Sequence, residues 1–437
     1  MNLSCSPTPS TVSVASSSYS SSQSRSRSPS PTSFFEQSLF SLFSHNNPAH
    51  GDPGDKCTFK HRNLPARPKE GGSRTRAGTH VTEGDGLASD KSGKVGSERV
   101  DNSTVRSKTE RKLRYKIPRN SGANTRLFAH HQWDAGLYLA EMIADQSSGG
   151  LGQECDRGRP REKFADVRGK YIVELGAGTG LPGLVASVMG ARKTILTDYP
   201  DPLVIANLNS NLNLALCPPR SSSESDQDHP GDPYSEARSK VLVEGLAWGN
   251  RFDEERVKSH LEFGVKDGFD LVLAADVLWV SSSHPLLISS LRSLLGRRSD
   301  SRILLVAGFH TGVPAVTRFF RSLSSPARDR DSKDGQVEGE EGGAGEVSQD
   351  EDARAAREGR WNRILPDWES KFGGIWERDV EGNERPWSGG RIPRKADLDL
   401  EVVSLAEGSL KEEEEEMGDL SERSRWVVCA FLRWADL

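Results

Sequence analysis

Three glycines and one aspartate form the part of the chain whose residue types and spacing best fit nucleoside binding. Gly176, Gly178 and Gly180 stand in ELGAGTG after a short apolar run, and Asp198 ends the next apolar run. Because glycines have no side chain, a cofactor can approach their backbone closely, and the glycines themselves can adopt dihedral angles that other residues resist. A carboxylate at the end of the second strand can accept hydrogen bonds from both ribose hydroxyls. The pattern therefore predicts a nucleoside site.

The residues beside this turn argue against a dinucleotide. The fingerprint G-x-G-x-x-G requires a third glycine where this chain has Leu181. Asp198 also has a second interpretation, because the PDP that follows it begins a helical pattern that Asp198 could cap. Its position at the end of an apolar run favours ribose binding.

Apolar runs alternate with helical patterns on both sides of the turn. Strands are predicted at 171–176, 194–197, 241–247, 269–274 and 303–307, and helices at 130–145, 181–189, 200–216, 285–295 and 313–323. This alternation indicates an α/β, Rossmann-like doubly wound fold with a mainly parallel sheet. Two further strands, within 373–380 and 425–434, have no helix between them and predict an antiparallel terminal hairpin, which makes seven strands.

The composition indicates one folded domain with disordered additions. Only 34% of the 437 residues are hydrophobic, and the mean hydropathy is -0.61. Residues 1–114 are predicted to form a disordered Ser/Pro/Arg-rich tail, although their acid-poor, Ser-rich start shares traits with a transit peptide. The ordered domain is expected at 115–437, with disordered insertions near 218–238, 325–358 and 388–420.

The charge and the cysteines argue against several kinds of partner. The formal charge of -5 gives no electrostatic reason to expect direct nucleic-acid binding. The five cysteines are far apart and include no CxxC pair, so we expect neither a disulfide framework nor a metal site. Such cysteines suit a reduced compartment, and we expect the protein to be located in the cytoplasm. No apolar run approaches the ~18 residues of a membrane-spanning helix. We expect a monomer without a membrane partner. Surface or capping roles are expected for four histidines without metal-ligand spacing: His130, His131, His284 and His310.

Several motifs together carry a family resemblance. The order ELGAGTG, with the antiparallel terminal strands, resembles the seven-strand class I S-adenosylmethionine methyltransferases. HQWDAG, TDYPDP, LAWGN, AADVLW and the N-x-x-x-N of Asn207 and Asn211 add a resemblance to methyltransferase family 16, a branch of lysine methyltransferases. TDYPDP and RSRWVVCAFLRW are most similar to its fungal group that methylates the N-terminus and adjacent lysine of elongation factor 1-alpha. Relatives of that group have been labelled nicotinamide N-methyltransferases.

This resemblance implies S-adenosyl-L-methionine as the cofactor and gives the predicted site residues their roles. The backbone of Gly176, Ala177 and Gly178 would contact the methionine and ribose, and Asp198 would hold the ribose hydroxyls. Trp248 would lie beside the adenine. Trp133 would close the pocket over the methionine end, and Ala275 would line the region of the sulfonium. The tryptophans could instead be core residues. Glu174 is either solvated or shapes the methionine pocket.

Asp276, directly after a predicted strand, is the candidate catalytic residue. It could orient the acceptor amine, which must be neutral to attack, or it could cap the next turn. The activity implied is N-methylation of a lysine or N-terminal amine of a protein substrate, with elongation factor 1-alpha as a candidate. The alternatives are a small-molecule, nicotinamide-like N-methyltransferase and a cofactor-binding fold without activity, against which the intact ELGAGTG and Asp198 argue.

Overall fold

The computed structural model describes eight parts of the chain: residues 51–65, 111–127, 129–147, 164–217, 233–262, 267–325, 363–393 and 425–435. Most of the predicted disordered tail lies outside these residues. The predicted insertion at 325–358 also lies outside them, apart from its first residue. The same holds for much of the predicted insertions at 218–238 and 388–420. No helix in the described parts is long and apolar enough to cross a membrane.

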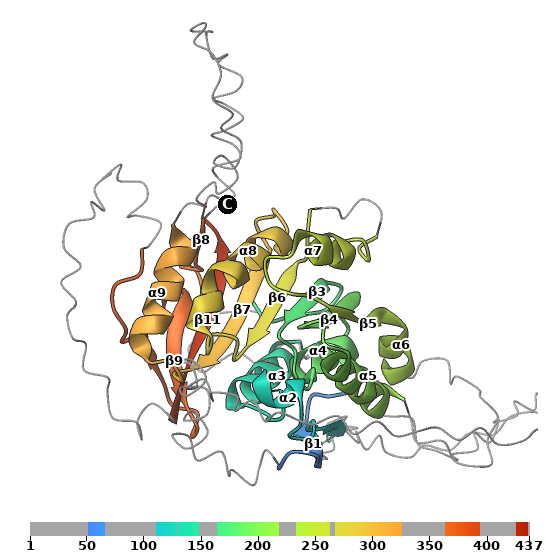
Figure 1. Cartoon of the computed structure of the whole chain (residues 1–437). Coiled ribbons are helices and arrows are strands. Elements are labelled where there is room, and N and C mark those ends of the chain that lie inside the picture. Colours follow the sequence, from blue (N-terminus) through green and yellow to red (C-terminus); the bar gives the residue numbers. More distant parts are fainter. Residues whose placement is uncertain are drawn as a thin grey trace, which may run out of the picture. The chain divides into compact units, whose positions relative to one another are not determined.

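One large sheet forms the centre of the domain (Figure 1). Its parallel strands are β3 (Tyr171–Leu175), β4 (Lys193–Asp198), β5 (Val241–Gly245), β6 (Leu271–Ala275) and β7 (Arg302–Gly308). The last strand, β11 (Trp426–Trp434), pairs antiparallel with both β7 and β9 (Ile375–Asp379). These seven strands confirm the predicted doubly wound sheet and its antiparallel hairpin. The sheet has nine strands rather than seven, because two three-residue strands, β8 (Ile364–Pro366) and β10 (Glu384–Pro386), pair with the hairpin.

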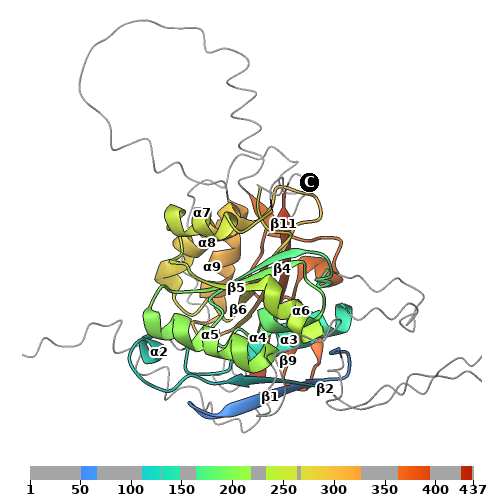
Figure 2. The ribbon, with the colours of Figure 1, turned by 90° about the vertical axis from the view of Figure 1, so that its right-hand side faces the viewer.

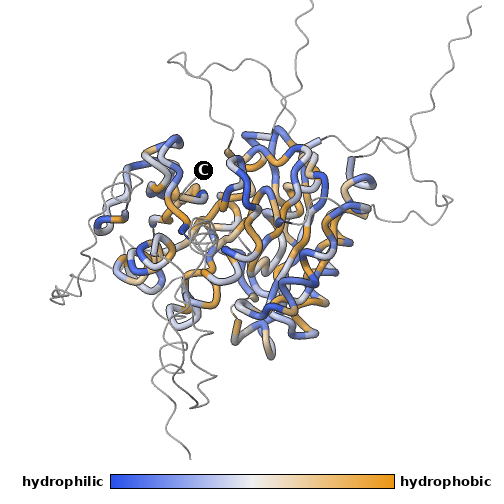
Figure 3. Tube along the Cα trace, turned by 90° about the horizontal axis from the view of Figure 1, so that it is seen from above, coloured by the Kyte–Doolittle hydropathy of each residue, from blue (hydrophilic) through white to orange (hydrophobic). Residues whose placement is uncertain are grey.

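Helices cover both faces of the sheet (Figure 2). One face carries α3 (Asp134–Gln146), α4 (Leu181–Val188), α5 (Pro202–Leu216) and α6 (Pro233–Lys240), and the other carries α7 (Arg251–Lys258), α8 (His284–Leu294) and α9 (Val313–Ser324). Every residue of β3 is buried, as expected of a central parallel strand covered on both sides. Orange and blue alternate along helices in Figure 3, because outer helices such as α9 present one apolar face to the sheet, whereas α4 is buried along its whole length.

A two-stranded sheet lies within the region predicted to be a disordered tail. Strand β1 (Lys56–His61) pairs antiparallel with β2 (Arg111–Lys116), so the prediction is wrong for 56–61 and 111–114. The physical reason is a small apolar face. Phe59 is 5% exposed, and Leu113 and Tyr115 are 0% and 1% exposed, within the core that also includes α3 and α5.

Two of the predicted insertions are also partly ordered. Helix α6 occupies the end of the 218–238 segment, because Tyr234 and Ala237 are buried in the core. Residues 388–393 begin the third predicted insertion and are held beside Trp387, whose ring lies 6.1 Å from that of Phe309 and 6.0 Å from that of Phe320.

Candidate functional site

The predicted site residues lie at the carboxyl ends of neighbouring parallel strands. Gly176 follows β3 and Asp198 ends β4, while Trp248 follows β5. Asp276 follows β6, on the other side of β3. The strand order reverses between β3 and β6, which is where open α/β sheets bind their ligands. The fold therefore gathers at one edge residues that are up to a hundred positions apart in the sequence.

The glycine turn combines close packing with open space. Gly176 and Gly178 have φ values of 62° and 54°, which favour glycine. A Cβ atom at Gly176 would lie 2.9 Å from Cγ1 of Val277 and 3.5 Å from Cζ2 of Trp248. A Cβ atom at Gly178 would meet no atom within 4 Å. The turn is therefore packed against Trp248 on one side and leaves room at Gly178.

The Asp198 carboxylate is fixed against this turn. Its Oδ2 accepts a hydrogen bond from the Gly178 N–H at 2.7 Å, and its Oδ1 accepts one from the Tyr199 N–H at 2.7 Å. The turn is also held by the Ala177 N–H, which donates to the Thr197 carbonyl at 3.0 Å. Burial raises the pKa of Asp198, and the two N–H groups oppose that rise. Each carboxylate oxygen has a further lone pair, so the group can still accept hydrogen bonds from a ligand.

The alternative reading of Asp198 as a helix cap is wrong. Helix α5 is capped by Asp201, whose side chain accepts a hydrogen bond from the Leu203 N–H at 2.9 Å. Because Asp201 performs that role, the carboxylate of Asp198 is not needed for capping.

Glu174 is buried directly beneath the turn, so the reading of a solvated side chain is wrong. It is 1% exposed, and its Oε2 accepts a hydrogen bond from the Gly183 N–H at 2.9 Å. Burial, assisted by the charge of Asp198 and opposed by the Gly183 N–H, raises the pKa of Glu174 to about 8. The side chain is therefore mostly neutral at pH 7.

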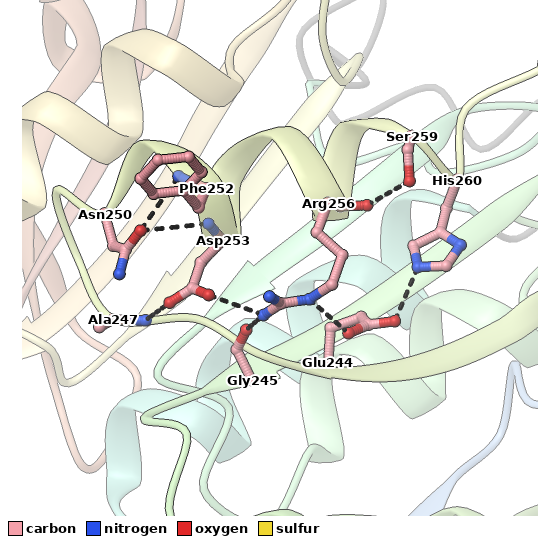
Figure 4. Close-up of polar contacts among 9 residues, drawn as sticks. All are labelled: Glu244, Gly245, Ala247, Asn250, Phe252, Asp253, Arg256, Ser259 and His260. Atoms are coloured by element: carbon pink, nitrogen blue, oxygen red, sulfur yellow. Dashed lines mark hydrogen bonds and ion pairs between the residues drawn. The ribbon is translucent and has the colours of Figure 1, made fainter.

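The loop that carries Trp248 is braced by a charged network (Figure 4). Oδ2 of Asp253 accepts a hydrogen bond from the Ala247 N–H at 3.0 Å. The guanidinium of Arg256 joins Asp253 at 2.9 Å to Glu244 of β5 at 3.2 Å. The indole is therefore presented to the glycine turn from a backbone fixed at both sides. It also packs against the apolar core, while its role beside the adenine stays a prediction.

Trp133 immediately precedes α3 as its N-cap residue, rather than lying within the predicted helix at 130–145. The neighbouring Gln132 accepts a hydrogen bond at Oε1 from the Thr179 hydroxyl at 2.6 Å, which ties this segment to the glycine turn. The ring of Trp133 lies 5.3 Å from that of His131 and meets the ring of His310 edge-on at 4.9 Å. Gln132 and Trp133 together thus link the glycine turn to the loop after β7.

Asp276 is held by the strand next to its own. It follows Ala275, has a φ of 57°, and accepts a hydrogen bond at Oδ1 from the Gly308 N–H at 2.9 Å. Its Oδ2 lies 2.8 Å from Nε2 of His310. These partners belong to the end of β7 and the loop after it, so capping of the next turn is not its role. The result is a carboxylate–imidazole pair at the same edge as Asp198.

His310 is the residue that sequence reasoning missed, since a surface or capping role was expected for it. Its imidazole is instead largely buried between Asp276 and Trp133. The available signal was the segment GFHTGVP directly after β7, because the strand β7 pairs with β6 and brings the two loops together.

Other polar residues support the site without facing it. Asn211 Nδ2 donates to the Lys116 carbonyl at 2.8 Å and the Thr179 carbonyl at 3.0 Å, and its Oδ1 accepts from the Lys116 N–H at 2.8 Å. His130 and His284 are buried rather than exposed, and desolvation lowers the pKa of each. Within the described parts of the chain, no group of three or more His, Cys, Asp or Glu side chains could hold a metal ion.

The geometry agrees with a known family. Residues 119–325 match the lysine methyltransferase family. This match confirms the resemblance inferred from the motifs, and it ends at the close of α9. Similar proteins include one named protein N-terminal and lysine N-methyltransferase efm7 in Emericella nidulans, which is 33% identical over 157 residues. Proteins of the same name from Kluyveromyces lactis and Schizosaccharomyces pombe are 31% and 32% identical.

These lysine methyltransferase relatives overlap only partly with the chain. The matches cover 35%, 42% and 38% of this chain and 54%, 59% and 49% of the three relatives. The chain thus spans about half the length of the curated relatives it matches. A solved structure described as a putative RNA methyltransferase from Pyrococcus horikoshii aligns with a TM-score of 0.27 and 16% identity, over 45% of this chain and 70% of that one.

Proposed function

We propose that the chain is an S-adenosyl-L-methionine-dependent protein N-methyltransferase that acts on a lysine or an N-terminal amine. The observation that carries this proposal is the Asp198 carboxylate fixed against the Gly178 N–H at the reversal of strand order. A ribose needs an acceptor for its hydroxyls and a backbone that it can approach closely. Asp198 retains free lone pairs and Gly178 borders open space, so the residues fit the cofactor.

Each end of the cofactor has a candidate partner. Trp248 would offer an aromatic face to the adenine, and the backbone of Gly176, Ala177 and Gly178 would border the methionine and ribose. The methionine end would be closed by Trp133, and Ala275 would line the region of the sulfonium with its backbone. When bound, the cofactor supplies a methyl group on a cationic sulfonium.

The protein's own task is to position the acceptor and keep it neutral. Methyl transfer is an in-line displacement, so most of the rate depends on orientation and on the exclusion of water. Desolvation beside a cation lowers the pKa of the acceptor amine. Asp276 is the positioning group, because Gly308 fixes one of its oxygens while the other faces His310. The Asp276 carboxylate would accept a hydrogen bond from the amine at a remaining lone pair, while the His310 imidazole holds the carboxylate in place.

A protein acceptor is favoured over a small molecule by the exposed apolar side chains that follow the site residues. Tyr199, next to Asp198, is 53% exposed, and Phe252, four residues after Trp248, is 88% exposed. Leu286, which borders the Trp248 loop at Gly249, is 49% exposed. Exposed apolar groups beside a site indicate a macromolecular surface as partner. Proteins named as N-terminal and lysine methyltransferases among the relatives support the same class.

Elongation factor 1-alpha is the candidate acceptor that follows from the resemblance, with the protein acting as a monomer in the cytoplasm. The decisive experiment incubates the full chain with radiolabelled S-adenosyl-L-methionine and a eukaryotic cell extract. We expect a labelled protein band at the size of the elongation factor. Label found only in small molecules would instead establish the nicotinamide-like alternative.

A matched pair of variants tests the carboxylate that carries the proposal. Calorimetry should show cofactor binding that Asp198→Ala weakens by about 1.4 kcal/mol or more, which is tenfold in affinity. Asp201→Ala is the control, because it removes a carboxylate three residues away that serves only as the cap of α5. Equal binding by the two variants would contradict the ribose assignment.

A further inference from the structure

The outer face of the two-stranded sheet carries an unusual set of cross-strand pairs. The register places Lys56 opposite Lys116 and Lys60 opposite Lys112, with Thr58 opposite Arg114 between them. Apart from the half-buried Lys116, all of these residues are exposed. This face, which we call the cationic face, therefore presents five cations and one hydroxyl in three consecutive rows.

The orientation of the cationic face is fixed by the opposite face. Phe59 and Leu113 form a facing pair in the register, Tyr115 lies opposite Cys57, and their side chains pack into the core with α3 and α5. Because side chains alternate along a strand, burying this apolar set forces the lysines outward. Figure 2 shows β1 and β2 running along one side of the domain, with α5 and α3 directly inside them.

Like charges directly opposite one another in a sheet are destabilising. Two such pairs occur here, Lys56 with Lys116 and Lys60 with Lys112. None of the five cations forms an ion pair with a carboxylate in the described parts of the chain, where the ion pairs involve other residues. Because the carboxylates of the described residues do not compensate these like-charged pairs, the face is suited to an anionic partner that does.

The chemistry of the cationic face selects among anionic partners. Lysine is depleted in protein–protein interfaces, whereas Lys, Arg and Thr are common contacts to nucleic-acid phosphates. The face has no aromatic side chain for stacking on bases and no apolar side chain for insertion into a membrane. Successive outward residues lie ~6.8 Å apart along each strand, which forms a regular charged ladder.

We propose that the cationic face binds the phosphate backbone of RNA without reading its sequence. The net charge of -5 for the whole chain does not reveal this face, because the five cations are concentrated on one small sheet. The choice of RNA rests on the cytoplasmic role proposed above. The binding itself needs neither cofactor nor methyl transfer, so its failure and that of the proposed function are distinguishable.

The test measures binding of a fluorescein-labelled 20-nucleotide RNA of mixed sequence to the full chain by anisotropy, at several salt concentrations. The variant Lys56→Glu/Lys60→Glu turns both like-charged pairs into opposite-charged pairs, so its melting temperature should not fall. The matched control is Arg297→Glu/Arg318→Glu, which changes the net charge equally at two exposed positions, one after α8 and one on α9. Figure 1 shows α9 well apart from β1.

We expect the lysine variant to bind at least tenfold more weakly than the control at ~0.1 M salt. Its plot of log K against log salt should be shallower by about 1.4, because two contacts to single-stranded phosphates are lost at ~0.7 each. Equal affinity of the two variants would overturn the proposal and assign any RNA binding elsewhere. Displacement of the RNA by polyglutamate at equal charge concentration would also overturn it, in favour of an acidic protein partner.

Discussion

The neutral, buried Glu174 makes a quantitative prediction about the pH dependence of stability. Its pKa of about 8 in the folded protein compares with 4.5 for the free side chain. Between these values the folded state binds the proton more tightly than the unfolded state, so the contribution of Glu174 to stability is fully present below pH 4.5 and is lost as the pH rises through about 8. At about 1.4 kcal/mol for each pH unit, raising the pH from ~5.5 to ~7.5 removes roughly 3 kcal/mol of this contribution. That is a substantial part of the ~5–15 kcal/mol typical of a folded domain.

The variant Glu174→Gln isolates this contribution. Glutamine keeps the neutral shape, and its amide oxygen can still accept the Gly183 N–H, but it cannot ionise. We expect urea titrations of the variant to lack the loss of roughly 3 kcal/mol between pH ~5.5 and ~7.5. Glu254→Gln is the control, because it removes another buried carboxylate, which accepts a hydrogen bond from Ser290. If Glu174→Gln and the unaltered protein lose stability in parallel over this range, the reasoning is refuted.

Three further predictions concern the site and its support. Asp276→Asn should lower the rate of methyl transfer by about 10²-fold while cofactor affinity, measured by calorimetry, stays within about twofold, because Asp276 acts on the acceptor; a matching loss of affinity would count against this. Trp248→Ala should weaken cofactor binding by about 1–2 kcal/mol, whereas Trp368→Ala, which alters a half-buried tryptophan beside Arg433 near the amino end of β7, should leave it unchanged. Asn211→Ala should lower the free energy of unfolding by about 2 kcal/mol in urea, because it leaves partners of three hydrogen bonds unpaired; a change under about 0.5 kcal/mol would contradict that role.

The sequence is most informative where one short segment determines a structure. The glycine turn and Asp198 could be placed because an apolar run, the glycines and a carboxylate follow one another within a single β-α-β unit. The parallel strands were found for the same reason, as each is a buried apolar run. Strands β8 and β10 were missed, because three residues are too few to show a period.

Contacts made across the sheet could not be predicted in this way. His310 meets Asp276 only because β7 pairs with β6 in a particular register, and nothing in the sequence spacing records that register. Strands β1 and β2 lie in segments whose composition resembles disorder, and each has few apolar residues. Their pairing becomes favourable only when Phe59 and Leu113 share the core of the larger domain.

The hydrogen bonds of Asn211 determine how short a working fragment of this protein can be. Its side chain is 1% exposed and joins the backbone of Lys116 to that of Thr179 in the glycine turn. A fragment that begins at 115 would lose all of β1 and most of β2. Strand β2 therefore belongs to the minimal unit, and β1 with it. Truncation for crystallisation should remove residues before 51 and keep both strands.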